Sequence, residues 1–96
     1  MRIAFIGVSH WHAPIYYQPA ARLAGVHIVA VSDPNALVAE RMARELEAKP
    51  FTDYRDLIAD ARPDFVFAFG RHCDMPDTAF ALIEEEVPFL LEKPAD

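Results

Sequence analysis

Four short runs rich in apolar residues, none of them broken by regular polar alternation, constrain the fold of this chain most strongly. A strand without polar alternation is buried on both of its faces, as in the middle of a parallel sheet. The chain is therefore expected to fold around such a sheet. The expected strands are Ile3 to Ile6, His27 to Val31, Phe65 to Phe69 and Val87 to Leu91, with a weaker fifth at Phe51-Thr52.

Between these runs the spacing of apolar residues changes to that of an amphipathic helix. Val38, Met42 and Leu46 fall on one stripe, and charged residues occupy the rest of the helix surface. This spacing predicts a helix that packs one side on the sheet. Further helices are expected from Ala13 to Leu23, from Asp53 to a stop before Pro63, and from Asp74 and Pro76 to near Glu86.

The boundaries of the helix around Met42 carry recognisable signals. Asp33 is a favoured N-cap residue, and Pro34 after it suits the first helical position, where no N–H is needed. Lys49-Pro50 is expected to end the helix, because proline cannot continue the hydrogen-bond ladder.

Strands and helices alternate along the whole chain. Alternation with buried strands implies right-handed crossovers onto one parallel sheet. The expected fold is an open, doubly wound α/β sheet with helices on both faces and the strand order 3-2-1-4-5. No linker or repeat interrupts residues 1–96, which are therefore expected to form a single domain.

Charge and cysteine content exclude several classes of function. The net charge of −6 offers no broad positive surface for nucleic acid or an anionic membrane. Cys73 is the only cysteine, so no internal disulfide can form, and a reducing compartment, the cytoplasm, is expected. The apolar run at Ile3 is too short for a signal peptide or a membrane span.

Polar and reactive side chains gather directly after the expected strands. Ligands of open α/β sheets bind outside the carboxyl ends of the strands, so this clustering predicts a binding site at that edge. The residues expected to contact a cofactor there are Gly7, Ser9, His10, Trp11, His12, Asp33, Gly70, Arg71, Glu92 and Lys93.

Asp33 is the most informative of these residues. A carboxylate after the second strand can accept hydrogen bonds from both hydroxyls of an adenosine ribose, and it repels a 2′-phosphate. This position favours NAD over NADP. The alternative is that Asp33 serves only as a helix cap.

The first turn, Gly7 to His12, lies where a phosphate-binding G-x-G-x-x-G would lie, but it keeps only the first glycine. Ser9 is small enough to let a pyrophosphate approach the backbone and adds a hydroxyl donor. His12, at the third glycine position, is expected to tilt the following helix away from the strand.

The order of these features resembles the glucose-fructose oxidoreductase / inositol dehydrogenase / MocA family. The similarity covers all 96 residues and includes Asp53-Tyr54-Arg55-Asp56-Leu57 and, most specifically, Glu92-Lys93-Pro94. It implies a Rossmann-like N-terminal domain that binds NAD or NADP. It also implies hydride transfer to or from a hydroxyl-bearing carbon of a sugar or cyclitol-like substrate, with Lys93 as the catalytic residue.

Two departures from the family pattern stand out. Where the family has a Thr-Pro pair and a later histidine, this chain reads Gly70-Arg71-His72-Cys73-Asp74-Met75. Family members also continue into a C-terminal α/β domain that supplies most substrate contacts and the general base. The resemblance therefore implies that residues 1–96 are the first part of a longer two-domain chain, which forms homo-oligomers through its second domain.

Three other interpretations use the same loops. His10, His12, His72, Cys73 and Asp74 could together hold a metal ion, because the first and fourth strands are neighbours in the expected order. A phosphoacceptor receiver domain would need a pair of acids after the first strand, where this chain has Gly7-Val8-Ser9. Cys73 could act as a nucleophile, although a half-buried, inert thiol is the simpler expectation.

Overall fold

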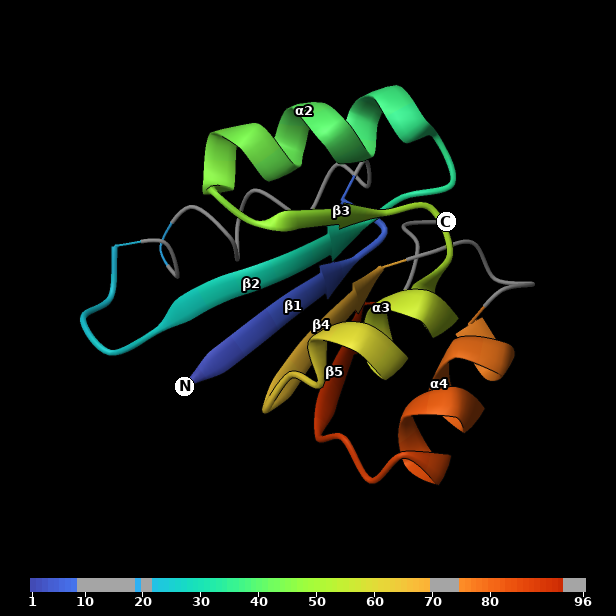
Figure 1. Cartoon of the computed structure of the whole chain (residues 1–96). Helices are drawn as coiled ribbons and strands as arrows, with labels where there is room; N and C mark the ends of the chain where they lie inside the picture. The colour runs from blue at the N-terminus through green and yellow to red at the C-terminus, as the bar shows by residue number, and fades with distance from the viewer. Residues whose placement is uncertain (9–18, 20–21, 70–74, 93–96) are drawn as a thin grey trace.

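The computed structural model describes residues 1–8, 19, 22–69 and 75–92 of the chain, and Figure 1 shows it as a sheet flanked by helices. The sheet has five strands in the order β3-β2-β1-β4-β5, and every neighbouring pair is parallel, as the sequence predicts. The strands are β1 (Arg2–Ile6), β2 (His27–Ser32), β3 (Lys49–Phe51), β4 (Phe65–Phe69) and β5 (Phe89–Glu92). The helices of the described residues are α2 (Ala36–Leu46), α3 (Tyr54–Ala61) and α4 (Met75–Glu84).

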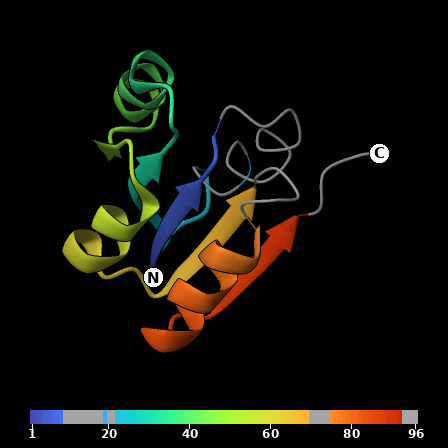
Figure 2. The ribbon, with the colours of Figure 1, turned by 90° about the vertical axis from the view of Figure 1, so that its right-hand side faces the viewer.

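Helices cover both faces of the sheet, with α2 on one face and α3 and α4 on the other (Figures 1 and 2). Successive residues of β1 point to opposite faces, so Phe5 packs with Met42 of α2, whereas Ala4 and Ile6 pack with Leu57 of α3. Two hydrophobic cores result, and β1 contributes to both. This double burial explains why its sequence shows no polar alternation.

Three phenylalanines of β1 and β4 form a ring cluster in the core beneath α2. The ring of Phe5 stacks on that of Phe67 with 5.1 Å between centroids, and on that of Phe69 at 6.5 Å. Phe5 and Phe67 are register partners across the parallel pair. This packing ties the two central strands together near their carboxyl ends.

The start of α2 differs from the sequence-based expectation. Its N-cap is Asn35, whose side chain accepts hydrogen bonds from the N–H groups of Leu37 and Val38. Asp33 is therefore not the cap, and Pro34 is not the first helical residue. Asp33 instead accepts the N–H of Asn35 at 2.9 Å, so the chain makes an extra turn around Pro34 before the helix begins.

The end of α2 was also expected too late in the sequence. The helix ends at Leu46, and Glu47 takes a left-handed conformation with φ 55°. The chain then enters β3, in which Pro50 pairs with Val31 of β2. Because β3 lies at the edge of the sheet, Pro50 has no second neighbouring strand that would need its missing N–H.

The remaining boundaries agree closely with expectation. Asp53 caps α3 through the N–H of Arg55 at 2.9 Å, and α4 ends at Glu84, near the expected Glu86. β5 begins at Phe89 rather than Val87, because the N–H of Val87 donates to the carbonyl oxygen of Leu82 at the end of α4. Of the helix expected from Ala13 to Leu23, residues 13–18, 20 and 21 lie outside the described residues, as does Asp74.

None of the helices in the described residues is long and apolar enough to cross a membrane.

Candidate functional site

The carboxyl ends of the strands lie together along one edge of the sheet (Figure 2). At this edge the chain leaves β1 through Gly7, whose N–H donates to the carbonyl oxygen of Ser32 at 2.8 Å. The N–H of Val8 donates to the same oxygen at 3.2 Å. The first loop is therefore anchored to the end of β2.

Gly7 is also confined on its other side, by β4. Its φ of 80° is a left-handed conformation that favours glycine, and a Cβ at this position would overlap the carbonyl oxygen of Phe69 and lie 2.9 Å from the carbonyl carbon. A residue with a side chain cannot take this place without moving β4. The close approach of β4 thus explains sterically why glycine occupies the first position of the expected phosphate-binding turn.

Asp33 follows β2 at the same edge and is held through its backbone. Its N–H donates to the carbonyl oxygen of Phe51 at 3.1 Å, which joins the ends of β2 and β3. Its Oδ1 accepts the N–H of Asn35. Only 3% of the residue is exposed, so its carboxylate lies within the edge rather than out in solvent.

The structure brings three of the expected site residues to this edge. Gly7 follows β1, Asp33 follows β2, and Glu92 is the last residue of β5, where its backbone is in register with Phe69 of β4. The other expected contacts lie outside the described residues; they are Ser9, His10, Trp11, His12, Gly70, Arg71 and Lys93.

The alternative metal site falls on the same undescribed segments. All five of its candidate ligands, His10, His12, His72, Cys73 and Asp74, lie outside the described residues. Among the residues that the structure describes, no group of three or more His, Cys, Asp or Glu side chains is arranged to hold a metal ion.

Asn35 is a residue at this edge that sequence reasoning missed. Its signal was present, because asparagine caps helices as well as aspartate does. The Asp33-Pro34 pair matched the pattern of a cap followed by proline equally well, and it concealed the second candidate two residues later.

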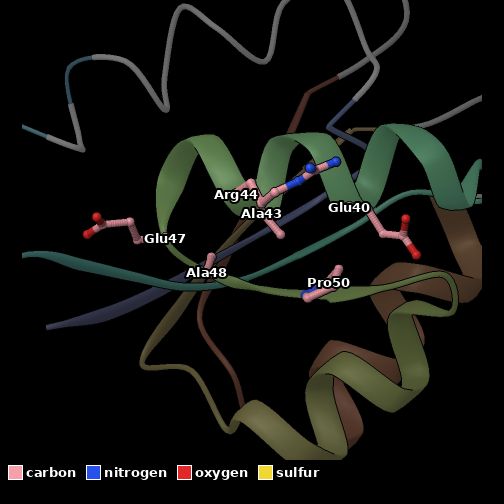
Figure 3. A pocket seen from close by; sticks show the side chains of 6 residues that line it. All are labelled: Glu40, Ala43, Arg44, Glu47, Ala48 and Pro50. Carbon is pink, nitrogen blue, oxygen red and sulfur yellow. The ribbon is translucent and has the colours of Figure 1, made fainter.

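A separate hollow of about 440 Å³ lies beside the last turns of α2 and the start of β3 (Figure 3). It includes neither Gly7 nor Asp33. Its walls combine small apolar groups with both signs of charge, and they are formed by Glu40, Ala43, Arg44, Glu47, Ala48 and Pro50. The hollow is thus distinct from the edge at which the strands end.

The strand order, the confined glycine after β1 and the acidic residue after β2 together define a dinucleotide-binding α/β domain. Comparison with known proteins gives the same class. Residues 1–95 match the oxidoreductase family with an NAD-binding Rossmann fold that comprises glucose-fructose oxidoreductase, inositol dehydrogenase and MocA. The chain belongs to this family, as its Glu92-Lys93-Pro94 segment and strand order suggest, and it is an NAD-binding Rossmann domain.

Solved structures support the assignment of the fold. A UDP-N-acetylglucosamine 3-dehydrogenase from Acidithiobacillus ferrooxidans is 30% identical, with a TM-score of 0.80 over 98% of this chain and 30% of that one. A myo-inositol dehydrogenase from Corynebacterium glutamicum is 23% identical, with a TM-score of 0.86 over 100% and 28%. GenD2 of gentamicin A biosynthesis, solved in complex with NAD, is 19% identical, with a TM-score of 0.88 over 97% and 26%.

This chain spans between 26% and 30% of the length of these solved proteins. No curated protein matches it.

Proposed function

We propose that this chain is the cofactor domain of an oxidoreductase that transfers a hydride between NAD and a hydroxyl-bearing carbon of a sugar or cyclitol-like substrate. The observation that carries the proposal is that Asp33 directly follows Ser32, whose carbonyl oxygen accepts the N–H groups of Gly7 and Val8 at the carboxyl edge of the sheet. The 30% identity to a dehydrogenase named for a nucleotide sugar supports the substrate class.

Asp33 is proposed to accept hydrogen bonds from the hydroxyls of the adenosine ribose. A carboxylate acceptor makes charge-assisted hydrogen bonds, which are roughly twice as strong as neutral ones. Its charge opposes a 2′-phosphate and therefore favours NAD over NADP. Because only 3% of Asp33 is exposed, a bound ribose has to displace the groups that cover the carboxylate.

Gly7 fits a role in bringing phosphate close to the backbone. A hydrogen atom in place of a side chain leaves the turn after β1 compact, and the anchoring of Gly7 and Val8 to Ser32 fixes its course. When bound, NAD supplies the nicotinamide ring that gives or takes the hydride. The protein's contribution is to hold that ring at the edge of the sheet.

The remaining contacts are proposed because these residues directly follow the expected strands, where open α/β sheets bind their ligands, and only the catalytic role of Lys93 comes from the family resemblance. Ser9, His10, Trp11, His12, Gly70, Arg71, Glu92 and Lys93 are assigned to the cofactor site. Lys93 is also proposed as the catalytic residue that donates a hydrogen bond to the substrate oxygen and relays its proton as the hydride moves. Pro94 follows Lys93 in the sequence, and because a residue before proline generally favours extended conformations, this pair would help to aim the ammonium group.

The substrate, the partners and the location complete the proposal. The length of the solved neighbours supports a second domain. The family resemblance implies that this domain selects a small-molecule substrate and mediates homo-oligomer formation. The single cysteine suits a reducing compartment and favours a cytoplasmic location.

Calorimetric titration with NAD and with NADP tests the role of Asp33. Asp33→Ala should weaken NAD binding by about 1.5–3 kcal/mol, a roughly 10- to 150-fold change in Kd, and relax the bias against NADP. Asp60→Ala, which removes the same charge from the exposed ion pair with Lys49, is the control and should preserve both affinities. An unchanged NAD-to-NADP ratio in Asp33→Ala would contradict the proposal.

A further inference from the structure

We propose that Asn35 is a positioning residue for cofactor choice, because it links the carboxylate of Asp33 to the first turn of α2. This inference rests on the proposed role of Asp33 in binding the ribose. It concerns a residue that itself need not touch the cofactor.

Two consecutive turns make the link. The backbone N–H of Asn35 donates to Asp33 Oδ1 at 2.9 Å. The Asn35 side-chain oxygen in turn accepts the N–H groups of Leu37 at 3.0 Å and Val38 at 3.4 Å. Since Pro34 has no N–H, the amide of Asn35 is the first one after Asp33 that can hold the carboxylate.

The arrangement gives the capping of α2 to Asn35 and leaves Asp33 for the proposed role of ribose acceptor. A single aspartate that capped the helix would commit its oxygens to the first turn of that helix. Asp53 does this at the start of α3, where its Oδ1 accepts the N–H of Arg55. At the start of α2, by contrast, Asn35 is the N-cap, and Asp33 lies directly after the end of β2 without capping the helix.

The position of the backbone N–H of Asn35 depends on the N-cap that its side chain forms. Asn35 has extended backbone angles, φ −85° and ψ 109°, which are stabilised by the hydrogen bonds that its side chain accepts from the helix. Without these bonds the first turn of α2 frays and the amide loses its fixed place. Asp33 Oδ1 would then lose a donor that limits rotation of the carboxylate.

Loss of this orientation should affect the two cofactors unequally. Hydrogen bonds from the ribose hydroxyls of NAD require a correctly directed acceptor, since they weaken steeply with misalignment. Repulsion of the 2′-phosphate of NADP depends on charge and distance, which a rotated carboxylate largely retains. A variant without the cap should therefore bind NAD less tightly, while its affinity for NADP should stay nearly the same.

Binding of NAD and NADP to four variants tests the inference, with unfolding by urea measured in parallel. Asn35→Ala should weaken NAD binding about fivefold, a change no larger than a typical cap can transmit, and alter NADP binding less than about twofold. Asn35→Ser, which keeps a capping oxygen, should restore the wild-type ratio. Asn35 is exposed, so neither variant disturbs the core.

Asp53→Ala is the matched control, because it removes an equivalent N-cap from α3 and should lower stability similarly while leaving the cofactor ratio within about twofold of wild type. A wild-type ratio in Asn35→Ala, or an equal shift in Asp53→Ala, would overturn the inference. Asp33→Ala distinguishes a failure of the positioning role of Asn35 from a failure of the ribose-binding role of Asp33. If Asp33→Ala shifts the ratio of NAD to NADP affinity and Asn35→Ala does not, only the positioning role is wrong. If Asp33→Ala does not shift this ratio, the proposed role of Asp33 itself is wrong.

Discussion

Gly7 and the carbonyl group of Phe69 are so close that no side chain fits between them. The contact joins the exit of β1 to the last residue of β4, at the edge where the cofactor is proposed to bind. Gly25 has the same φ of 80°, yet a Cβ added there would meet no atom within 4 Å. Comparing alanine substitutions at the two glycines therefore separates the free-energy cost of the left-handed backbone from that of the close approach to Phe69.

Gly7→Ala should lower the free energy of unfolding by about 2–5 kcal/mol, because it combines the left-handed conformation with overlap against β4. Gly25→Ala should lower it by about 1–2 kcal/mol, the conformational part alone. Urea denaturation of both variants measures the difference. Equal losses in the two variants would show that the contact with Phe69 carries no energetic weight.

The core beneath α3 should be far more sensitive to truncation than the outer surface of α2. Leu57 is fully buried, whereas Leu37 is 77% exposed. Leu57→Ala should cost about 2–5 kcal/mol, and Leu37→Ala should stay within about 0.5 kcal/mol of wild type. Thermal or urea unfolding of the pair checks this prediction. A small effect of Leu57→Ala would mean that α3 does not pack on the sheet as described.

The end of α2 offers a stabilising substitution. Glu47 has φ 55° and ψ 46°, a conformation in which glycine avoids the strain of a side chain. Glu47→Gly should raise the free energy of unfolding by about 0.5–1 kcal/mol after the greater entropy of the unfolded glycine is subtracted. Glu45→Gly, inside the same helix, should lower it by about 1 kcal/mol. Destabilisation by both substitutions would argue against the left-handed cap.

The sheet could be predicted from the sequence because its central strands are buried on both faces. Ala4 of β1 and Val66 of β4 are fully buried, and strands buried in this way have unbroken apolar runs in their sequence. β3 was harder to recognise, because a short edge strand that contains Pro50 resembles a helix terminator. Its pairing with β2 depends on a neighbour distant in the sequence, which local spacing does not encode.

The site was only partly predictable. The position of Asp33 directly after β2 was predicted correctly, because the apolar run before it marks where that strand ends. Its contact with the ribose stays a prediction. The N-cap role of Asn35 was missed, because both Asp33 and Asn35 are residue types that favour the start of a helix. The left-handed Glu47 was also missed, since such positions usually carry glycine and only the folded backbone identifies them.

NMR titration of the ¹⁵N-labelled chain with NAD shows whether NAD binds at the carboxyl edge of this sheet. The amide signals of Gly7, Val8 and Asp33 should shift as NAD is added, because they lie where β1 and β2 end. Those of Arg2 and His27, where the same strands begin, should remain in place. No shifts at all, or shifts confined to Arg2 and His27, would show that NAD does not bind at this edge.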